Sequence, residues 1–328
     1  MAAPDAQRLA TALGPVLGAG LTIEGLTRVS GGASRETWLF DAVAGDGTRH
    51  GLVLRRDPGG HGGQSDRATE YALLEATANA GVAVPRPRLL LTTADGLGTG
   101  FVMERIEGET IPRRILRDAE YEAARPQLAR QCGAIAAAIH ATDTASLPHL
   151  PTLDAAAQIA QWRGVLDLVG EPRPALELGL RWLDERVPPA PTPARLVHGD
   201  FRNGNLVVGP DGVRAALDWE LAHLGDPVED LGWLCVRSWR FGVDERVVGG
   251  FGDLDELLAG YTSAGGVAPT PELVHYWMVF GTVKWGVITI LQAHAHLSGT
   301  VRSVELATLG RRVVEMEWDT LDAIEGRW

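Results

Sequence analysis

The chain has 328 residues, of which 45% are hydrophobic and 22% are charged, as is typical of a globular protein. This length predicts two domains or lobes. The formal net charge of −12 argues against a broad surface for nucleic acid or an anionic membrane. Of the 30 lysine and arginine residues, Lys284 is the single lysine. A P-loop, which needs a Gly-Lys pair, is therefore excluded.

Compartment and redox state are inferred from three further features. Cys132 and Cys235 are far apart in the sequence, which predicts buried, reduced thiols rather than a disulfide or a zinc site. The N-terminus shows no apolar run of the kind found in signal peptides, so a cytoplasmic location is expected. Residues 274–291 are strongly apolar but include His275 and Lys284, which favours a buried helix over a membrane span.

The first part of the chain is predicted to be rich in strands. Short apolar or β-branched runs alternate with turns that contain Gly and Asp. The predicted strands are residues 21–29, 37–43, 50–56, 88–92 and 100–105, with one helix at residues 66–80.

Helical periodicity dominates from there on. Leu128, Cys132, Ile135 and Ile139 recur with the spacing of an amphipathic helix. Further helices are predicted at 154–168, 173–186, 227–240, 254–264, 271–296 and 301–325, with a hairpin formed by 205–208 and 213–218. The sequence thus predicts an α+β protein with a β-rich lobe at residues 1–104 and a mostly helical lobe at 105–328.

The segment from 196 to 234 contains the strongest chemical motif. His198-Gly199-Asp200 is followed after four residues by Asn205, and the predicted hairpin ends at Asp218. Phosphoryl transfer from a magnesium nucleotide needs a carboxylate for the attacking hydroxyl and oxygen ligands for the metal. We therefore predict Asp200 as the catalytic base and Asn205 and Asp218 as Mg²⁺ ligands.

The alternative is a polar turn before a hairpin, where Asn, Asp and Gly are common. The second carboxylate, 13 residues after Asn205, favours the catalytic interpretation. His198 is expected to organise the loop by hydrogen bonding, and Glu220 is a candidate contact to the metal or the substrate.

These motifs resemble those of the aminoglycoside phosphotransferase and choline kinase-like superfamily, which is related to the protein kinases. More narrowly, HGDFRNGNLV, LDWELAHLGDP and LVLRRDPGG resemble the kinase domain fused to some acyl-CoA dehydrogenases and bacterial 4-hydroxyacyl-CoA kinases. The resemblance implies a protein kinase-like bilobal fold that uses ATP and Mg²⁺, with GTP left open as the nucleotide.

By the same resemblance, the third strand is where a lysine would hold the nucleotide phosphates. Arg55 occupies that position and is expected to replace it, because a guanidinium group binds phosphate in a bidentate manner. Glu70 is the preferred partner of Arg55 and Glu75 the second choice. Arg56, on the opposite face of the strand, is expected to be solvated.

Two other segments complete the predicted nucleotide site. The small residues Gly31, Gly32 and Ser34 would let backbone amides approach phosphates, although a Gly-Gly turn is as common in a plain hairpin. Residues 101–105 resemble the hinge that receives a purine. Recognition there would use backbone groups from Met103, Glu104 and Arg105, with the side chains of Val53 and Met103 as apolar walls.

Three residues of the helical lobe had functional and structural alternatives. Asp226 and Asp230 lie at a predicted helix start, where an acidic side chain caps the helix, so a structural role is favoured. The lone Lys284 lies in an apolar run, where a charge needs a partner. It is expected either to contact an anionic acceptor or to form a structural ion pair.

The acceptor is expected to be a small molecule, with no nucleic-acid or membrane partner. The local basic run of Arg113, Arg114 and Arg117 and the narrower resemblance favour a hydroxyacyl-CoA or hydroxy acid. Most of the net negative charge falls after residue 104, which favours the alternative of a cationic acceptor such as an aminoglycoside or choline. An inactive nucleotide-binding pseudokinase is a further alternative, which the presence of Asp200, Asn205 and Asp218 disfavours.

Overall fold

The computed structural model describes residues 3–29, 36–57 and 67–327. These residues form two compact units. The first unit contains residues 1–108 together with two segments that are distant in sequence, 145–149 and 214–221. The second unit contains residues 109–144, 150–213 and 222–328.

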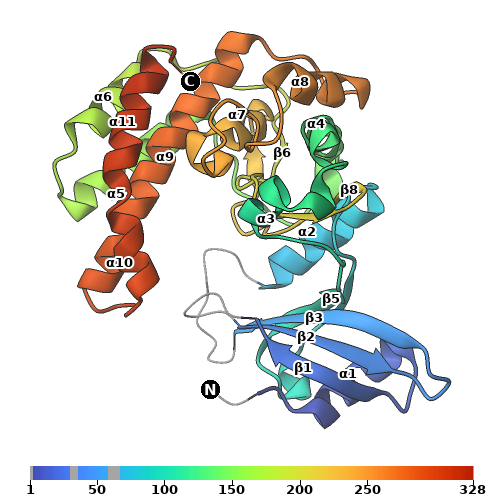
Figure 1. Ribbon diagram of the computed structural model, residues 1–328. Helices are drawn as coiled ribbons and strands as arrows, with labels where there is room; N and C mark the ends of the chain where they lie inside the picture. Colours follow the sequence, from blue (N-terminus) through green and yellow to red (C-terminus); the bar gives the residue numbers. More distant parts are fainter. Residues whose placement is uncertain (1–2, 30–35, 58–66, 328) are drawn as a thin grey trace. The chain divides into compact units, whose positions relative to one another are not determined.

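A five-stranded antiparallel sheet forms the first unit, with strand order β1-β2-β3-β5-β4 (Figure 1). Its strands are β1 (Thr22–Arg28), β2 (Glu36–Val43), β3 (Arg49–Asp57), β4 (Pro87–Leu90) and β5 (Thr99–Glu104), and its helices are α1 (Ala6–Leu17) and α2 (Arg67–Asn79). The five strands and α2 confirm the elements predicted for this region to within a few residues.

Alternation along the central strands separates a core face from a functional face. Trp38 and Phe40 of β2 and Leu52 and Leu54 of β3 are buried in a cluster with residues of α1. Because successive side chains of a strand point to opposite faces, Val53 and Arg55 lie on the other face. Burial of the first set therefore fixes where the side chain of Arg55 points.

The helix α1 has no counterpart in the sequence-based prediction, which places no element before residue 21. The side chain of Asp5 caps this helix by accepting hydrogen bonds from the N–H groups of Gln7 and Arg8. Leu9 and Leu13 then lie one turn apart and are fully buried. The helix is held by packing on the sheet.

The second unit is mostly helical. Its helices are α3 (Pro112–Arg117), α4 (Arg125–His140), α5 (Ala155–Val169), α6 (Pro174–Asp184), α7 (Val228–Cys235), α8 (Leu254–Ser263), α9 (Pro271–Leu297), α10 (Val304–Gly310) and α11 (Val313–Ile324). The chain also contains two short strand pairs, β6 (Arg195–Val197) with β9 (His223–Gly225), and β7 (Leu206–Gly209) with β8 (Gly212–Ala216), the last three residues of which belong to the first unit. The fold is therefore of the predicted α+β class.

Two helices predicted in the second unit are shorter than expected. The helix predicted at 227–240 ends at Cys235, because Val236 is extended, and continues as a 3₁₀ turn, η4 (Arg237–Arg240). The helix predicted at 301–325 is divided. The N–H groups of Arg311 and Arg312 donate to carbonyls three residues earlier, which ends α10 before α11 begins.

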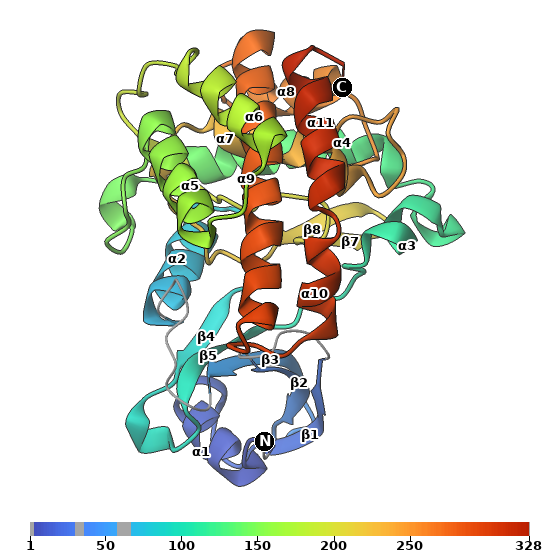
Figure 2. The ribbon, with the colours of Figure 1, turned by 90° about the vertical axis from the view of Figure 1, so that its left-hand side faces the viewer.

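The long helix α9 is the centre of the second unit. It packs against α6, α7, α10 and α11, and Figure 2 shows it running between these elements. Among the described residues it is the one helix long and apolar enough to cross a membrane, but 78% of its most apolar stretch is buried inside the protein. A core helix meets the same criteria, as predicted for this segment.

Candidate active site

The loop that carries the HGD motif lies directly after β6, and a side chain of α7 holds its backbone by hydrogen bonds. Asp230 of α7 is fully buried, and its two carboxylate oxygens accept hydrogen bonds from the N–H groups of His198 (2.8 Å) and Gly199 (2.9 Å). Gly199 has φ of +78°, a conformation that side chains disfavour. Asp230 therefore sets the course of the backbone leading into Asp200, which supports its structural role.

His140 of α4 completes the support of this loop. Its Nε2 atom lies 3.0 Å from Asp230 Oδ2. Burial disfavours the charged carboxylate, but the hydrogen bond and charge of His140 outweigh it and lower the pKa of Asp230. His198 acts within the loop, where its Nδ1 accepts a hydrogen bond from the N–H of Asp200 at 3.2 Å.

The carboxylate of Asp200 is held by three donors. Its Oδ1 atom accepts hydrogen bonds from Trp233 Nε1 (2.9 Å) and Arg202 Nε (3.0 Å), and its Oδ2 atom accepts one from Asn205 Nδ2 (2.6 Å). A carboxylate offers about four acceptor positions. Oδ2 therefore retains capacity to accept the proton of a hydroxyl group.

Asn205 is oriented by the same contacts. Its Nδ2 atom donates to both the backbone carbonyl and the carboxylate of Asp200, at 2.9 and 2.6 Å. With the nitrogen used in this way, the side-chain carbonyl oxygen of Asn205 is left as an acceptor. A hard cation such as Mg²⁺ prefers such an oxygen ligand.

A second polar cluster belongs to the first unit. The partly buried Arg55 donates from Nη1 to Glu70 Oε1 (2.6 Å) and from Nη2 to Asp218 Oδ1 (2.8 Å), and Glu70 also pairs with Arg67 (2.7 Å). Of the two partners predicted for Arg55, the first choice, Glu70, is thus in contact. Asp218 joins the cluster because residues 214–221 belong to the same unit.

The electrostatics and backbone of this cluster are unusual. Burial disfavours the charged form of Arg55, but the carboxylates of Glu70 and Asp218 raise the pKa of Arg55 above its ordinary value. Asp218 has a φ of +70°, which is rare outside glycine and costs backbone energy. Strain of this kind is common at functional sites.

The structure shows which backbone groups of the predicted hinge are already hydrogen-bonded. Met103 lies opposite Val53 in the β3–β5 pair, as expected for two apolar walls. The N–H groups of Glu104 and Arg105, however, already donate to the carbonyls of Arg86 and Gly51, both at 2.9 Å. These two donors are therefore engaged within the first unit rather than available to a purine.

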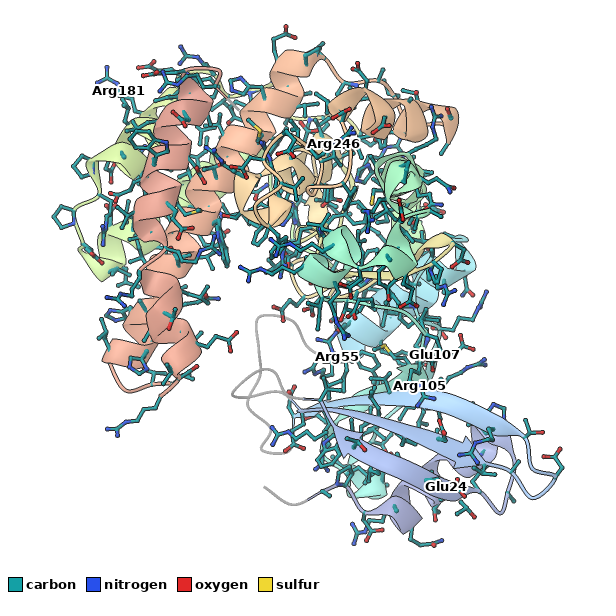
Figure 3. All side chains as sticks on the ribbon, in the orientation of Figure 1. Glu24, Arg55, Arg105, Glu107, Arg181 and Arg246 are labelled. Carbon is teal, nitrogen blue, oxygen red and sulfur yellow. The ribbon has the colours of Figure 1, made fainter. Side chains whose placement is uncertain are left out.

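The side chains of the hinge are also engaged. Glu104 pairs with Arg88, while Arg105 pairs with Asp41 (2.8 Å) and Glu107 (2.9 Å; Figure 3). Recognition of a base by this segment is thus left to carbonyl oxygens or to residues after Arg105.

Arg56 is not solvated, contrary to the sequence-based expectation. It is 6% exposed and pairs with the fully buried Glu36 at 2.9 Å. The face of the sheet opposite Arg55 is the core face, so a cation placed there requires a buried partner.

Of the two alternatives for Lys284, its surroundings favour the structural one. The ammonium group is buried, donates to the Gly199 carbonyl (3.0 Å) and Glu229 Oε1 (3.3 Å), and lies 4.6 Å from the centre of the Trp233 ring. The ammonium group therefore stabilises the backbone of the catalytic loop, and these contacts do not favour a direct contact with an acceptor.

Three predicted residues, Gly31, Gly32 and Ser34, lie outside the described residues. Glu220 is partly exposed, and its contact with metal or substrate stays a prediction.

Two residues that hold Asp200, Trp233 and Arg202, are not among the predicted site residues. Arg202 lies over the ring of Trp239, 4.4 Å from its centre, and Trp239 contacts Trp233 at 5.3 Å between ring centres. No spacing rule links residues 200 and 233. The Arg202 side chain, two residues after the aspartate, was the one local signal available.

Residues 25–267 match the model of the phosphotransferase enzyme family. The chain is also 32% identical over 204 residues to acyl-CoA dehydrogenase family member 11 from Gallus gallus, an alignment that covers 55% of this chain and 24% of that protein. The chain thus spans about a quarter of the length of the curated relatives it matches.

Two solved structures show the same fold. A proposed aminoglycoside phosphotransferase from Ralstonia eutropha JMP134 matches with a TM-score of 0.75 and 22% identity, covering 98% of this chain and 99% of that one. A thermostable mutant of an aminoglycoside phosphotransferase, in a ternary complex with AMP-PNP and hygromycin B, matches with a TM-score of 0.60 and 18% identity, covering 96% and 99%. These likenesses confirm the predicted fold class, and because the family model spans well over half of the chain, the protein belongs to the phosphotransferase enzyme family.

Proposed function

We propose that this protein transfers the γ-phosphoryl group of ATP, with Mg²⁺, to a hydroxyl group of a small molecule. The observation that carries the proposal is the Asp200 carboxylate, which three donors hold while one oxygen keeps capacity for a hydroxyl proton. In this reaction the hydroxyl oxygen bonds to the γ-phosphorus, the bond between that phosphorus and the β-phosphate oxygen breaks, and the hydroxyl proton passes to Asp200. ADP leaves.

The residues present fit a magnesium nucleotide. Asn205 in the second unit and Asp218 in the first unit each offer a hard oxygen donor of the kind that Mg²⁺ takes, and both are the proposed metal ligands. When bound, Mg²⁺ would neutralise charge on the phosphates. Arg55 has five N–H donors, of which the contacts to Glu70 and Asp218 use two, so donors remain for phosphate oxygens.

We propose a hydroxyacyl-CoA or a hydroxy acid as the acceptor. The support is the likeness to acyl-CoA dehydrogenase family members, proteins whose names refer to acyl-CoA substrates. The alternative is an aminoglycoside, because a structural neighbour was solved with hygromycin B and because the net negative charge of this chain would attract a cation.

The experiment is to incubate the purified protein with Mg²⁺-ATP and a panel of hydroxyacyl-CoAs, hydroxy acids, aminoglycosides and choline. ADP release identifies the acceptor, and a product mass increase of one phosphoryl group identifies the reaction. ADP release with GTP in place of ATP tests the nucleotide. Absence of product with every hydroxyl acceptor, together with nucleotide binding, would instead support the pseudokinase alternative.

Replacing Arg55 by methionine is expected to weaken the binding of ATP at least tenfold and to leave the binding of adenosine nearly unchanged, because only the phosphates lose a partner. Calorimetry with both ligands measures this difference. The matched control is Arg49→Met, an exposed arginine on the same strand. An equal loss for ATP and adenosine would show that the substitution acts by disturbing the fold of the first unit.

Replacing Asp218 by asparagine is expected to abolish the increase in nucleotide affinity that Mg²⁺ provides. Asparagine tolerates positive φ better than alanine does, so the backbone at +70° is preserved while the charge is lost. Titrations of ATP with and without Mg²⁺ test this, with the exposed Asp46→Asn as control. An undiminished Mg²⁺ effect in the variant would remove Asp218 from the metal site.

A further inference from the structure

A large cavity of about 960 Å³ opens on the second unit between α3, η4 and α11. Its lining includes four arginines, three carboxylates and two aromatic residues: Arg113, Arg117, Arg237 and Arg312, then Asp244, Glu315 and Asp319, and Phe241 and Trp318. This volume lies at the upper end of the range for cavities that hold drug-sized ligands. We call this cavity the arginine groove.

Two of the four arginines carry uncompensated charge. Arg237 pairs with Asp244 and Arg312 with Glu315, each at 2.8 Å. In the part of the chain that the structure describes, the exposed guanidinium groups of Arg113 and Arg117 have neither an ion pair nor a hydrogen bond. They lie one helical turn apart on α3, so both can reach one ligand.

The neighbouring Arg114 shows the contrast. It pairs with Glu109 at 2.7 Å and does not line the groove. Of the basic run recognised in the sequence, the structure therefore directs two positive charges into one cavity and neutralises the third outside it.

The groove also offers a flat apolar surface. Trp318 is 65% exposed although it is large and aromatic, and it lines the same cavity. Phe241 has a φ of +49°, which is unfavourable for an aromatic residue. An exposed aromatic ring beside free arginines fits a ligand that joins phosphate groups to a ring or an apolar chain.

One residue that lines the arginine groove is next in sequence to a residue that contacts the catalytic loop. Ser238 of η4 lines the cavity, and the next residue, Trp239, packs under Arg202, which in turn bonds to Asp200. A long acceptor bound in the groove would thus have its anchor close to the residues that hold the catalytic base.

We propose that the arginine groove binds the phosphate groups of the acceptor through Arg113 and Arg117, with Trp318 against an apolar or ring portion. This inference rests on the proposed function and deepens it. It assigns the acceptor to the phosphate-bearing polyanions, of which a coenzyme A thioester is the member that also carries a hydroxyacyl chain. A cationic aminoglycoside would not pair with the guanidinium groups of Arg113 and Arg117.

The test uses coenzyme A itself as the probe, titrated by calorimetry into the full chain with saturating AMP-PNP present. AMP-PNP keeps coenzyme A out of the nucleotide site. The double variant R113Q/R117Q is expected to bind coenzyme A at least tenfold more weakly than the parent chain. Added salt is expected to reduce this difference in affinity. The single variant Trp318→Leu is expected to bind coenzyme A several-fold more weakly.

The control is Arg130→Gln, which removes an exposed arginine from α4, outside the groove. Because all these arginines are exposed, we expect unchanged melting temperatures. Undiminished binding of coenzyme A by R113Q/R117Q, or no binding by the parent chain, would overturn the inference. Failure of the proposed function appears separately, as loss of AMP-PNP binding and of ADP release in the parent chain.

Discussion

Replacing Asp200 by asparagine is expected to lower turnover by about two orders of magnitude or more, the usual scale of general base catalysis. The amide keeps the shape of the side chain and its contacts to Trp233 and Arg202 through the oxygen, but it cannot take the hydroxyl proton. Affinity for AMP-PNP is expected to change by less than about threefold. The measurements are ADP release with the acceptor found in the panel, and calorimetry with AMP-PNP.

A matched control separates the role of Asp200 from a general effect of lost charge. Asp255 of α8 is exposed, and Asp255→Asn removes one negative charge from the same unit. It is expected to leave turnover unchanged. Near-normal turnover of Asp200→Asn with its true acceptor would show that another group accepts the proton.

Local patterns predicted the elements of the fold because these depend on neighbouring residues. Apolar and β-branched runs between turns predicted the strands β2 and β3, and the family resemblance of the third strand placed Arg55 at the phosphate-binding position. The four-residue spacing between Asp200 and Asn205 gave two members of the catalytic loop, which contact each other at 2.6 Å. Each of these predictions needs only the residues of a strand or of one loop.

Other features could not be predicted, because they depend on which distant segments pack together. Trp233 reaches Asp200 from the following helix, and residues 214–221 join the first unit from far along the chain. The burial of Arg56 follows from Glu36 on the neighbouring strand, since an arginine and a glutamate 20 residues apart carry no recognisable signature. For the same reason the sequence does not show that the N–H groups of Glu104 and Arg105 donate to the carbonyls of Arg86 and Gly51.

Lys284 shows most clearly why the sequence alone does not identify a distant partner. The sequence showed one lysine in an apolar helix, which requires a partner but does not identify it. In the structure the partner is Glu229, and the same ammonium group holds the carbonyl of Gly199 next to Asp200. A charge buried for structural reasons thus bears on the site through the loop it supports.

Replacing Lys284 by methionine is expected to lower the free energy of unfolding by about 3–5 kcal/mol, the usual cost of removing one member of a buried ion pair. Glu229 would keep its contacts to His223 (3.1 Å) and Gln158 (2.6 Å), but it would lose a cation in a site without water access. Urea unfolding measures the change. Arg302→Met, which removes an exposed cation, is the control and is expected to change stability by less than about 0.5 kcal/mol.

The pH dependence of the free energy of unfolding tests whether Glu229 is the partner of Lys284. Burial raises the pKa of Glu229, but His223 and Lys284 outweigh it and lower that pKa to about 2, from 4.5. A group with a lowered folded-state pKa stabilises the fold above its unfolded pKa, and this contribution is lost as the pH falls. The stability difference between the parent chain and Glu229→Gln should therefore be largest above pH 4.5 and shrink towards pH 2.

The double variant Lys284→Met with Glu229→Gln completes the test, because it removes both charges together. It is expected to be more stable than Lys284→Met alone, since no carboxylate is then left buried without its cation. If Lys284→Met instead leaves stability unchanged and raises only the Michaelis constant of an anionic acceptor, the ammonium group contacts the acceptor and the ion pair is not its role.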